Sequence, residues 1–345
     1  MSKTQELEEA LNTIEELCTT EQIKELLRQS KKEDDEVKIS AEKKHDLVHV
    51  NLKAAVEAKL ISLESLFGLI RASEENGNQH VFYYKASRQL AATLSYQQIG
   101  QRIWGDNYSK KLETFPSAKV VPNSYRVADF RGVGQNKPND WILKIYGHAF
   151  VARATGEEEE RATNRLWREF IVEPLRIVLV ARWNSPDLLE IRVQRNESRR
   201  RIESWEEEIW KTLGSALVKS QFSPWVLRKQ MGRLITENEK NALVYTFRDA
   251  SLIDKTGVHA TFQTESDQGS LFASEETKSA VKNYMDSESE CSGLTITWLQ
   301  RGSTGPKKQL RTLLGSKASN EMIVFGHCYS GDLDYVTDQL RYFGA

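Results

Sequence analysis

The chain has 345 residues, and its 48 Lys plus Arg against 49 Asp plus Glu leave a net charge of -1. Its three cysteines are too few for a disulfide scaffold or for an all-cysteine zinc site within one chain. No apolar run approaches the ~18–20 residues of a membrane span, and the first residues lack the basic-then-apolar pattern of a signal peptide. We therefore expect an intracellular protein, cytoplasmic and nucleoid-associated or nuclear, without membrane contact.

The near-neutral total hides an uneven distribution of charge. Residues 1–80 hold 11 basic and 17 acidic residues, 81–240 hold 27 and 19, and 241–345 hold 10 and 13. A basic middle between two acidic ends points to a polyanionic partner.

Residues 1–80 are predicted to form a helical interaction module that binds a protein partner. The first of four expected helices carries an apolar stripe at three-to-four spacing, made of Leu7, Leu11, Ile14 and Leu17. A second helix is expected to open at Thr20, a third to follow an N-cap at Ser40, and a fourth to span 62–70.

Residues 81–140 are predicted to be a linker that includes a candidate helix-turn-helix. A strand over 80–84 leads into short helices over 87–94 and 96–104. The second helix and the residues after it carry side chains suited to base edges and phosphates: Gln98, Gln101, Arg102, Lys110 and Lys111. An ordinary amphipathic helix is the competing interpretation.

Residues 141–235 are predicted to be a basic α+β domain. Strands are expected over 141–146 and 148–153, or as one long bent strand, and 176–182 with 188–194 resemble a hairpin. Helices are expected over 202–218 and 224–234.

The arginines of this domain fall into two groups. Arg161, Arg165 and Arg168 have helical spacing and predict one arginine face on a helix. Arg199, Arg200 and Arg201 are candidate phosphate contacts, because the guanidinium fork matches phosphate geometry. Neighbouring glutamates, such as those at 157–160 and 206–208, would neutralise this surface under the alternative interpretation of a solvated, salt-bridged helix.

Residues 236–345 are predicted to be a second α+β domain. Strands are expected over 243–247, 258–262, 294–298 and 322–325, with helices over 274–285 and 330–342. The fold class predicted for the whole chain is α+β: an N-terminal helical module, then mixed or antiparallel sheets with helices packed on one face.

Enzyme motifs are incomplete in this chain. His327-Cys328 between a strand and a helix resembles a cysteine-phosphatase loop, but the required arginine is replaced by Asp334, so a buried thiol with Ser330 as N-cap is preferred. No phosphate-loop, dinucleotide or nucleophile-elbow motif occurs. We therefore expect no catalytic residues and no cofactor.

Metal-ligand patterns are also incomplete. His45 and His49 would share a helix face near Glu42, yet no third dedicated ligand is visible, so no metal site is assigned. Asp187 and Glu190 lie in the 176–194 hairpin, where a metal-dependent nuclease would need two convergent carboxylates. That hydrolase remains an alternative function.

Four short stretches of the first 84 residues resemble the centromere protein N family in pattern and layout. They are Asp46-Leu-Val48, Lys59-Leu-Ile-Ser62, Leu66–Ile70 and Gln79-His-Val-Phe82. Beyond residue 140 only the alternation of strands and helices agrees. The resemblance implies a non-catalytic role in which a helical module and a basic groove bind nucleosomal DNA and histone.

The sequence thus favours a non-enzymatic nucleic-acid-binding or adaptor protein, with DNA as the nucleic acid. The phosphate backbone would bind the basic middle, and a protein would bind residues 1–80. A pure protein-interaction subunit is a further alternative.

Overall fold

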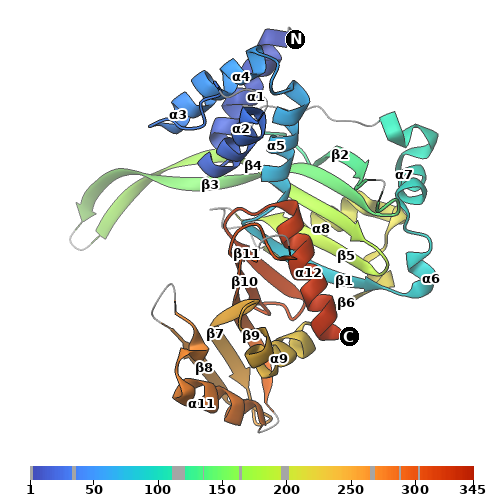
Figure 1. Ribbon diagram of the computed structural model, residues 1–345, viewed down its shortest axis with the longest axis vertical. Coiled ribbons are helices and arrows are strands. Elements are labelled where there is room, and N and C mark those ends of the chain that lie inside the picture. Colours follow the sequence, from blue (N-terminus) through green and yellow to red (C-terminus); the bar gives the residue numbers. More distant parts are fainter. Residues whose placement is uncertain are drawn as a thin grey trace.

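The computed structural model describes residues 3–32, 36–110, 121–134, 136–162, 165–195, 202–264, 269–286, 289–301 and 304–345. Its centre is an eleven-stranded sheet in the order β2-β3-β4-β5-β1-β11-β10-β9-β7-β8, with β6 paired to β1 (Figure 1). Every described strand pair is antiparallel. The predicted α+β class is therefore confirmed, in its antiparallel form.

The elements have the following bounds. The strands are β1 Gln79–Ala86, β2 Arg126–Gly132, β3 Trp141–Ala162, β4 Arg165–Asn184, β5 Leu188–Gln194, β6 Phe222–Pro224, β7 Tyr245–Ile253, β8 His259–Gln263, β9 Glu290–Trp298, β10 Leu310–Leu314 and β11 Glu321–Phe325. The α-helices are α1 Lys3–Leu17, α2 Thr20–Lys31, α3 Lys44–Asp46, α4 Lys53–Glu57, α5 Leu63–Glu75, α6 Arg88–Ala91, α7 Tyr96–Trp104, α8 Ile202–Leu213, α9 Arg228–Thr236, α10 Asn238–Asn241, α11 Glu275–Asp286 and α12 Ser330–Gly344. A π-helix, η1 Leu47–Leu52, joins α3 to α4, and 3-10 turns are η2 Gly105–Lys110, η3 Gly214–Ala216, η4 Lys219–Gln221 and η5 Leu271–Ala273.

The helical module at the N-terminus has its own hydrophobic core. The predicted stripe of α1 supplies Leu11 and Ile14, which are fully buried against Leu27 of α2 and Leu66 of α5. Thr19 and Gln22 form a capping box that starts α2. The third helix begins at Lys44, later than the Ser40 cap predicted, and its N-cap residue Lys43 makes no side-chain capping hydrogen bond.

Strand β1 separates two larger cores. Its Val81 and Tyr83 face the core formed with α9 and α12, whereas Phe82 and Tyr84 face the core formed with α8. Successive side chains of a strand point to opposite faces, so one strand serves both cores. Helix α8 therefore covers one face of the sheet, and α9 and α12 cover the other.

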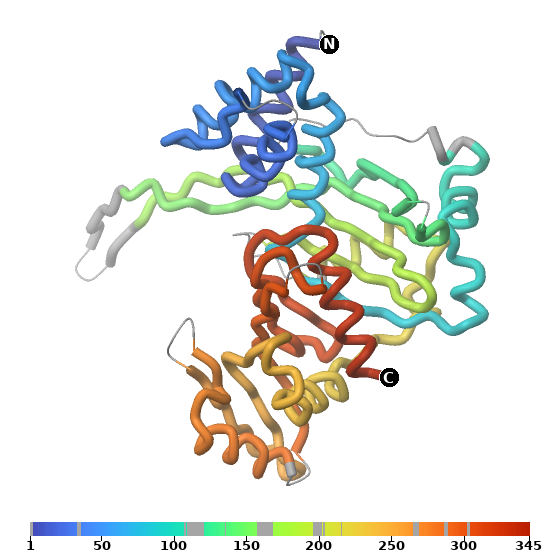
Figure 2. Tube along the Cα trace, in the orientation of Figure 1, coloured from blue at the N-terminus to red at the C-terminus, as the bar shows by residue number. Residues whose placement is uncertain are grey.

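Two parts of the strand layout differ from the predictions. The arginines at 161, 165 and 168 lie in β3 and β4, so the predicted helix is wrong. The two strands form one antiparallel hairpin that extends beyond the sheet (Figures 1 and 2). Their pairing satisfies the backbone groups that a helix would satisfy internally. Strands β2 and β10 were not predicted, because short strands in polar surroundings carry little alternation.

The predicted segments 81–140, 141–235 and 236–345 all contribute strands to this one sheet. Among the described residues, no helix has both the length and the apolar character needed to cross a bilayer.

Candidate functional site

The predicted base-reading helix is α7. Ile99 of α7 is buried, while Gln101 and Arg102 are exposed. The Gln98 side chain forms a capping box with Ser95, in which the Ser95 backbone N–H donates to Gln98 Oε1 at 3.2 Å. All three side chains are exposed, but that of Gln98 is also engaged in capping its own helix.

The remaining predicted contacts are less visible. Lys110 ends the turn η2, whose last side chains are outside the described part. Lys111, Arg199, Arg200 and Arg201 also lie outside the described residues.

A groove of about 460 Å³ lies where the helical module meets the sheet. Glu16 and Leu17 of α1 line one side, and Arg153 and Arg176 of the β3–β4 hairpin line another. Arg195, which directly follows β5, completes it. The groove therefore joins the predicted interaction module to the predicted basic domain.

The charge at the floor of the groove is neutralised. Glu74, at the end of α5, accepts hydrogen bonds from Arg176 at 2.6 Å, Lys144 at 2.9 Å and Tyr146 at 2.8 Å. All four side chains are buried. This network fixes the helical module on β3 and β4, so the groove walls are held in place.

A second buried carboxylate extends the network. Glu75 pairs with Lys144 at 3.4 Å and with Arg131 of β2. Burial by itself raises the pKa of the Glu75 carboxyl, but Lys144 and Arg131 outweigh it and hold that pKa below the usual value. The helical module is thereby tied to three strands of the sheet.

Two arginines with no ion pair to any described residue flank an aromatic ring beside this groove. The guanidinium carbon of Arg195 lies 5.2 Å from the ring centre of Phe325, and that of Arg311 lies 4.7 Å from the same centre. Arg311 faces Phe325 because β10 pairs with β11 in that register. The arrangement presents two positive charges and a half-buried aromatic ring on one surface.

Sequence reasoning missed the pairing of Arg311 with Phe325, since the two residues meet only through strand pairing. Arg195 was counted in the basic middle but not among the candidate contacts. The feature of the sequence that could have marked Arg195 as a candidate was its position directly after the strand predicted over 188–194.

The candidate nuclease carboxylates are occupied by protein groups. Glu190 is fully buried and accepts hydrogen bonds from Arg192 at 2.5 and 3.0 Å and from Asn184 at 3.2 Å. Asp187 lies 3.4 Å from Arg341 and 3.9 Å from Lys85. Metal-dependent cleavage through these two groups stays an untested hypothesis.

The thiol of the candidate phosphatase loop is buried, as the preferred interpretation expects. Burial and the nearby Asp332 raise the pKa of Cys328 to about 12, so the thiolate needed for nucleophilic attack is disfavoured. The N-cap of α12 is Tyr329, not the predicted Ser330, and its backbone N–H donates to Asp332 Oδ2 at 2.9 Å. Asp334 pairs with Arg182.

The β3–β4 hairpin carries apolar side chains into solvent. Phe150, Phe170, Ile171 and Val172 are 60, 48, 55 and 62 % exposed. They lie where the hairpin leaves the sheet, beyond the residues of β4 that pair with β5. Phe150, Phe170 and Val172 lie on one face of the hairpin and Ile171 on the other, because successive side chains of a strand alternate. Exposed apolar side chains that share a face are typical of an interaction surface.

One group of side chains among the described residues has the donors and spacing of a metal site: Glu15, His45 and His49. The two histidines were considered in the sequence, but Glu15 replaces the neighbour Glu42 as the third member.

Among known proteins, the chain matches no family model and no curated sequence.

Proposed function

We propose that this protein is a non-enzymatic nucleic-acid-binding protein that holds a phosphate backbone, with DNA as the expected ligand. The observation that carries the proposal is the pair Arg195 and Arg311 around Phe325, beside the groove between the helical module and the hairpin. Neither arginine forms an ion pair with a described carboxylate, so their charges are available to a ligand.

The chemistry of these side chains supports phosphate binding. A guanidinium makes bidentate contacts with phosphate oxygens, and each neutralised phosphate releases counterions. Phe325 lies against both guanidinium groups and so holds the two positive charges on one surface. The candidate contacts Arg199, Arg200 and Arg201 follow Arg195 closely in sequence and add three positive charges to this part of the chain.

Fluorescence anisotropy across a salt series tests the proposal. Labelled double- and single-stranded DNA and RNA would be titrated with the native chain and with Arg195→Gln, Arg311→Gln and the double variant. Each lost phosphate contact should reduce the salt slope by about one unit. The matched control is Lys240→Gln, because Lys240 is an exposed cation of α10 outside the groove. Slopes that are equal in all variants would overturn the assignment.

Magnesium distinguishes the nuclease alternative in the same assay. Loss of strand integrity with Mg²⁺, abolished by Asp187→Ala, would favour the hydrolase. Intact strands with and without Mg²⁺ support binding without catalysis.

The layout shared with the centromere protein N family suggests a nucleosomal form of the ligand. If this inference holds, the protein acts in the nucleus and binds reconstituted nucleosomes more tightly than naked DNA of the same length. Equal affinity for nucleosomes and for naked DNA would favour binding to the DNA phosphate backbone alone, as expected of a nucleoid protein.

A hollow in the helical module favours a second role as an adaptor. It measures about 300 Å³ and is lined largely by apolar residues, including Val37, Val50, Ala54 and Leu60. Val50 is 59 % exposed there. Affinity capture with the native chain and Val50→Lys tests this role. Val258→Lys is the control, since Val258 is 58 % exposed near β8. A partner retained equally by all three chains would contradict binding at this hollow.

A further inference from the structure

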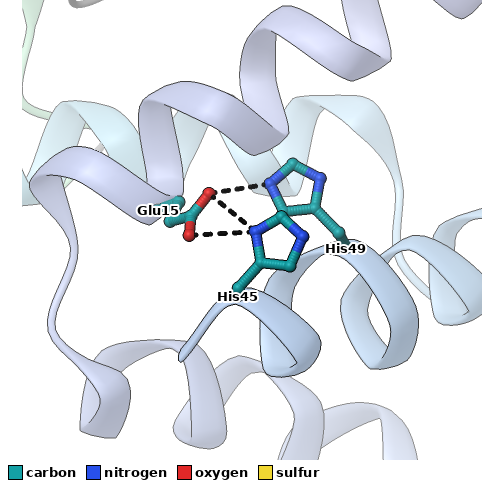
Figure 3. Close-up of side chains that lie close together, drawn as sticks. All are labelled: Glu15, His45 and His49. Carbon is teal, nitrogen blue, oxygen red and sulfur yellow. Dashed lines mark hydrogen bonds and ion pairs between the residues drawn. The ribbon is translucent and has the colours of Figure 1, made fainter. Parts of the chain in front are cut away.

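Three side chains of the helical module converge in the manner of metal ligands. Glu15 comes from α1, His45 from α3 and His49 from the π-helix η1 (Figure 3). His45 Nδ1 lies 3.1 Å from Glu15 Oε1, and His49 Nε2 lies 3.0 Å from Glu15 Oε2. The three ligand atoms all lie within 4.8 Å of one another.

These separations suit a small transition-metal ion. Zinc binds imidazole nitrogen and carboxylate oxygen at ~2.0–2.2 Å, so neighbouring ligands of a tetrahedral site are roughly 3.3–3.6 Å apart. The two nitrogen-to-oxygen distances, 3.0 and 3.1 Å, lie a few tenths of an ångström below that range. An ion can therefore enter with small adjustments of the side chains.

The local fold holds the two histidines together. They are four residues apart, so they lie on one face of the continuous α3–η1 helix, and their rings stack at 4.5 Å. Leu47, Val48 and Leu52 of η1 are fully buried and anchor this helix in the module core. π-Helical turns are rare and are often found at functional sites.

The surroundings favour a cation and leave room for one. Residues 1–80 are net acidic, and the nearby cation Lys53 is paired with Glu8 at 2.5 Å. His49 is 16 % exposed, whereas His45 is 63 % exposed. The ligand set is thus anchored on one side and open to water on the other.

We propose that Glu15, His45 and His49 bind one divalent transition-metal ion of the zinc class. Two imidazoles and one carboxylate match the ligand preference of Zn²⁺. No fourth such side chain joins the group within the described residues, so water or a partner's side chain takes the fourth position. The bound ion would link α1 to α3 and η1, in addition to the hydrophobic core that α1 and η1 share.

Calorimetric titration of the chelator-treated, tag-free full chain with ZnCl₂ tests the site. We expect one ion per chain, and an affinity at least tenfold weaker in Glu15→Gln and His49→Ala. The matched controls are Glu9→Gln on α1 and His259→Ala on β8, which should bind zinc as the native chain does.

Cobalt spectroscopy and hydrogen exchange add independent readouts. Co²⁺ should give the visible absorption of a tetrahedral site, and Zn²⁺ should slow amide exchange in α1 and η1 of the native chain but not of His49→Ala. A histidine–glutamate ion pair alone would bind no zinc stoichiometrically. That result, or equal binding by the Glu15→Gln and His49→Ala variants, would overturn the proposal.

Discussion

Glu74 and Arg176 are 102 residues apart in sequence, yet the two buried side chains meet, and Arg176 Nη2 donates a 2.6 Å hydrogen bond to Glu74 Oε1. Glu74 belongs to the last turn of the helical module and Arg176 to the strand beneath it. Together with Lys144, this pair sets the position of the module relative to the sheet, and with it the shape of the groove.

Removing the Glu74 charge should strongly destabilise the fold. Glu74→Gln removes the charge that pairs with buried Arg176 and leaves buried Lys144 paired with Glu75, and a lost partner in a buried ion pair costs about 3–5 kcal/mol. Urea unfolding of the native and variant chains measures this difference. Glu64→Gln in the same helix is the control, because Glu64 is exposed and its change should have little effect. Equal losses in both variants would contradict the role given to the network.

Acid should weaken the fold below about pH 4.5. Burial works against ionisation of Glu190, but Arg192 and Arg182 hold its pKa below the ordinary value of 4.5, and Lys144 and Arg131 do the same for Glu75. A lowered folded-state pKa gives stability that is complete above the unfolded value and is lost as pH falls through the folded value. Urea midpoints over a pH series check this. A midpoint that stays constant from pH 6 down to about pH 3 would be inconsistent with these ionised pairs.

Gly77 should tolerate no side chain. Its φ is +80°, and a Cβ there would approach Gly326 O to 2.4 Å and His327 Cα to 2.5 Å. We expect Gly77→Ala to destabilise the chain by more than about 1 kcal/mol, because both strain and a backbone clash arise. Gly68→Ala in α5 meets no atom within 4 Å and should stabilise by about 0.5–1 kcal/mol. Thermal unfolding should show a lower melting temperature for Gly77→Ala and a higher one for Gly68→Ala than for the native chain.

The exposed valine of the hairpin should be dispensable for folding. Val172 and Val178 lie on the same strand and the same face, but they are 62 and 3 % exposed. Val172→Lys should change the unfolding free energy by less than about 0.5 kcal/mol, whereas Val178→Lys buries an unpaired charge and should cost about 3 kcal/mol or more. A large loss for Val172→Lys in urea unfolding would mean that the hairpin packs on the chain.

Much of the fold followed from local patterns. The leucines of α1 and the alternation in β5 have the periods of their elements, and the structure has helices α1 to α5 before β1 and a β4–β5 hairpin where these patterns predicted them. The arginines at 161, 165 and 168 misled because their spacing is local, whereas the pairing of β3 with β4 over this stretch is not.

The sites depend on contacts that no local pattern contains. Glu15 joins the two histidines from 30 and 34 residues away, and Arg311 meets Phe325 through the register of β10 and β11. The paired histidines signalled a candidate, but the third ligand required the packing of α1 against η1.

The central place of β1 has a consequence during synthesis. His80 of β1 and Glu321 of β11 are 241 residues apart in sequence, so one edge of β1 waits for its partner until nearly the whole chain has been made. At ~5–20 residues per second, that wait lasts on the order of 10–50 s. For this time Val81 and Tyr83 lack their core, and the nascent chain presents an open strand edge that chaperones at the ribosome would have to shield.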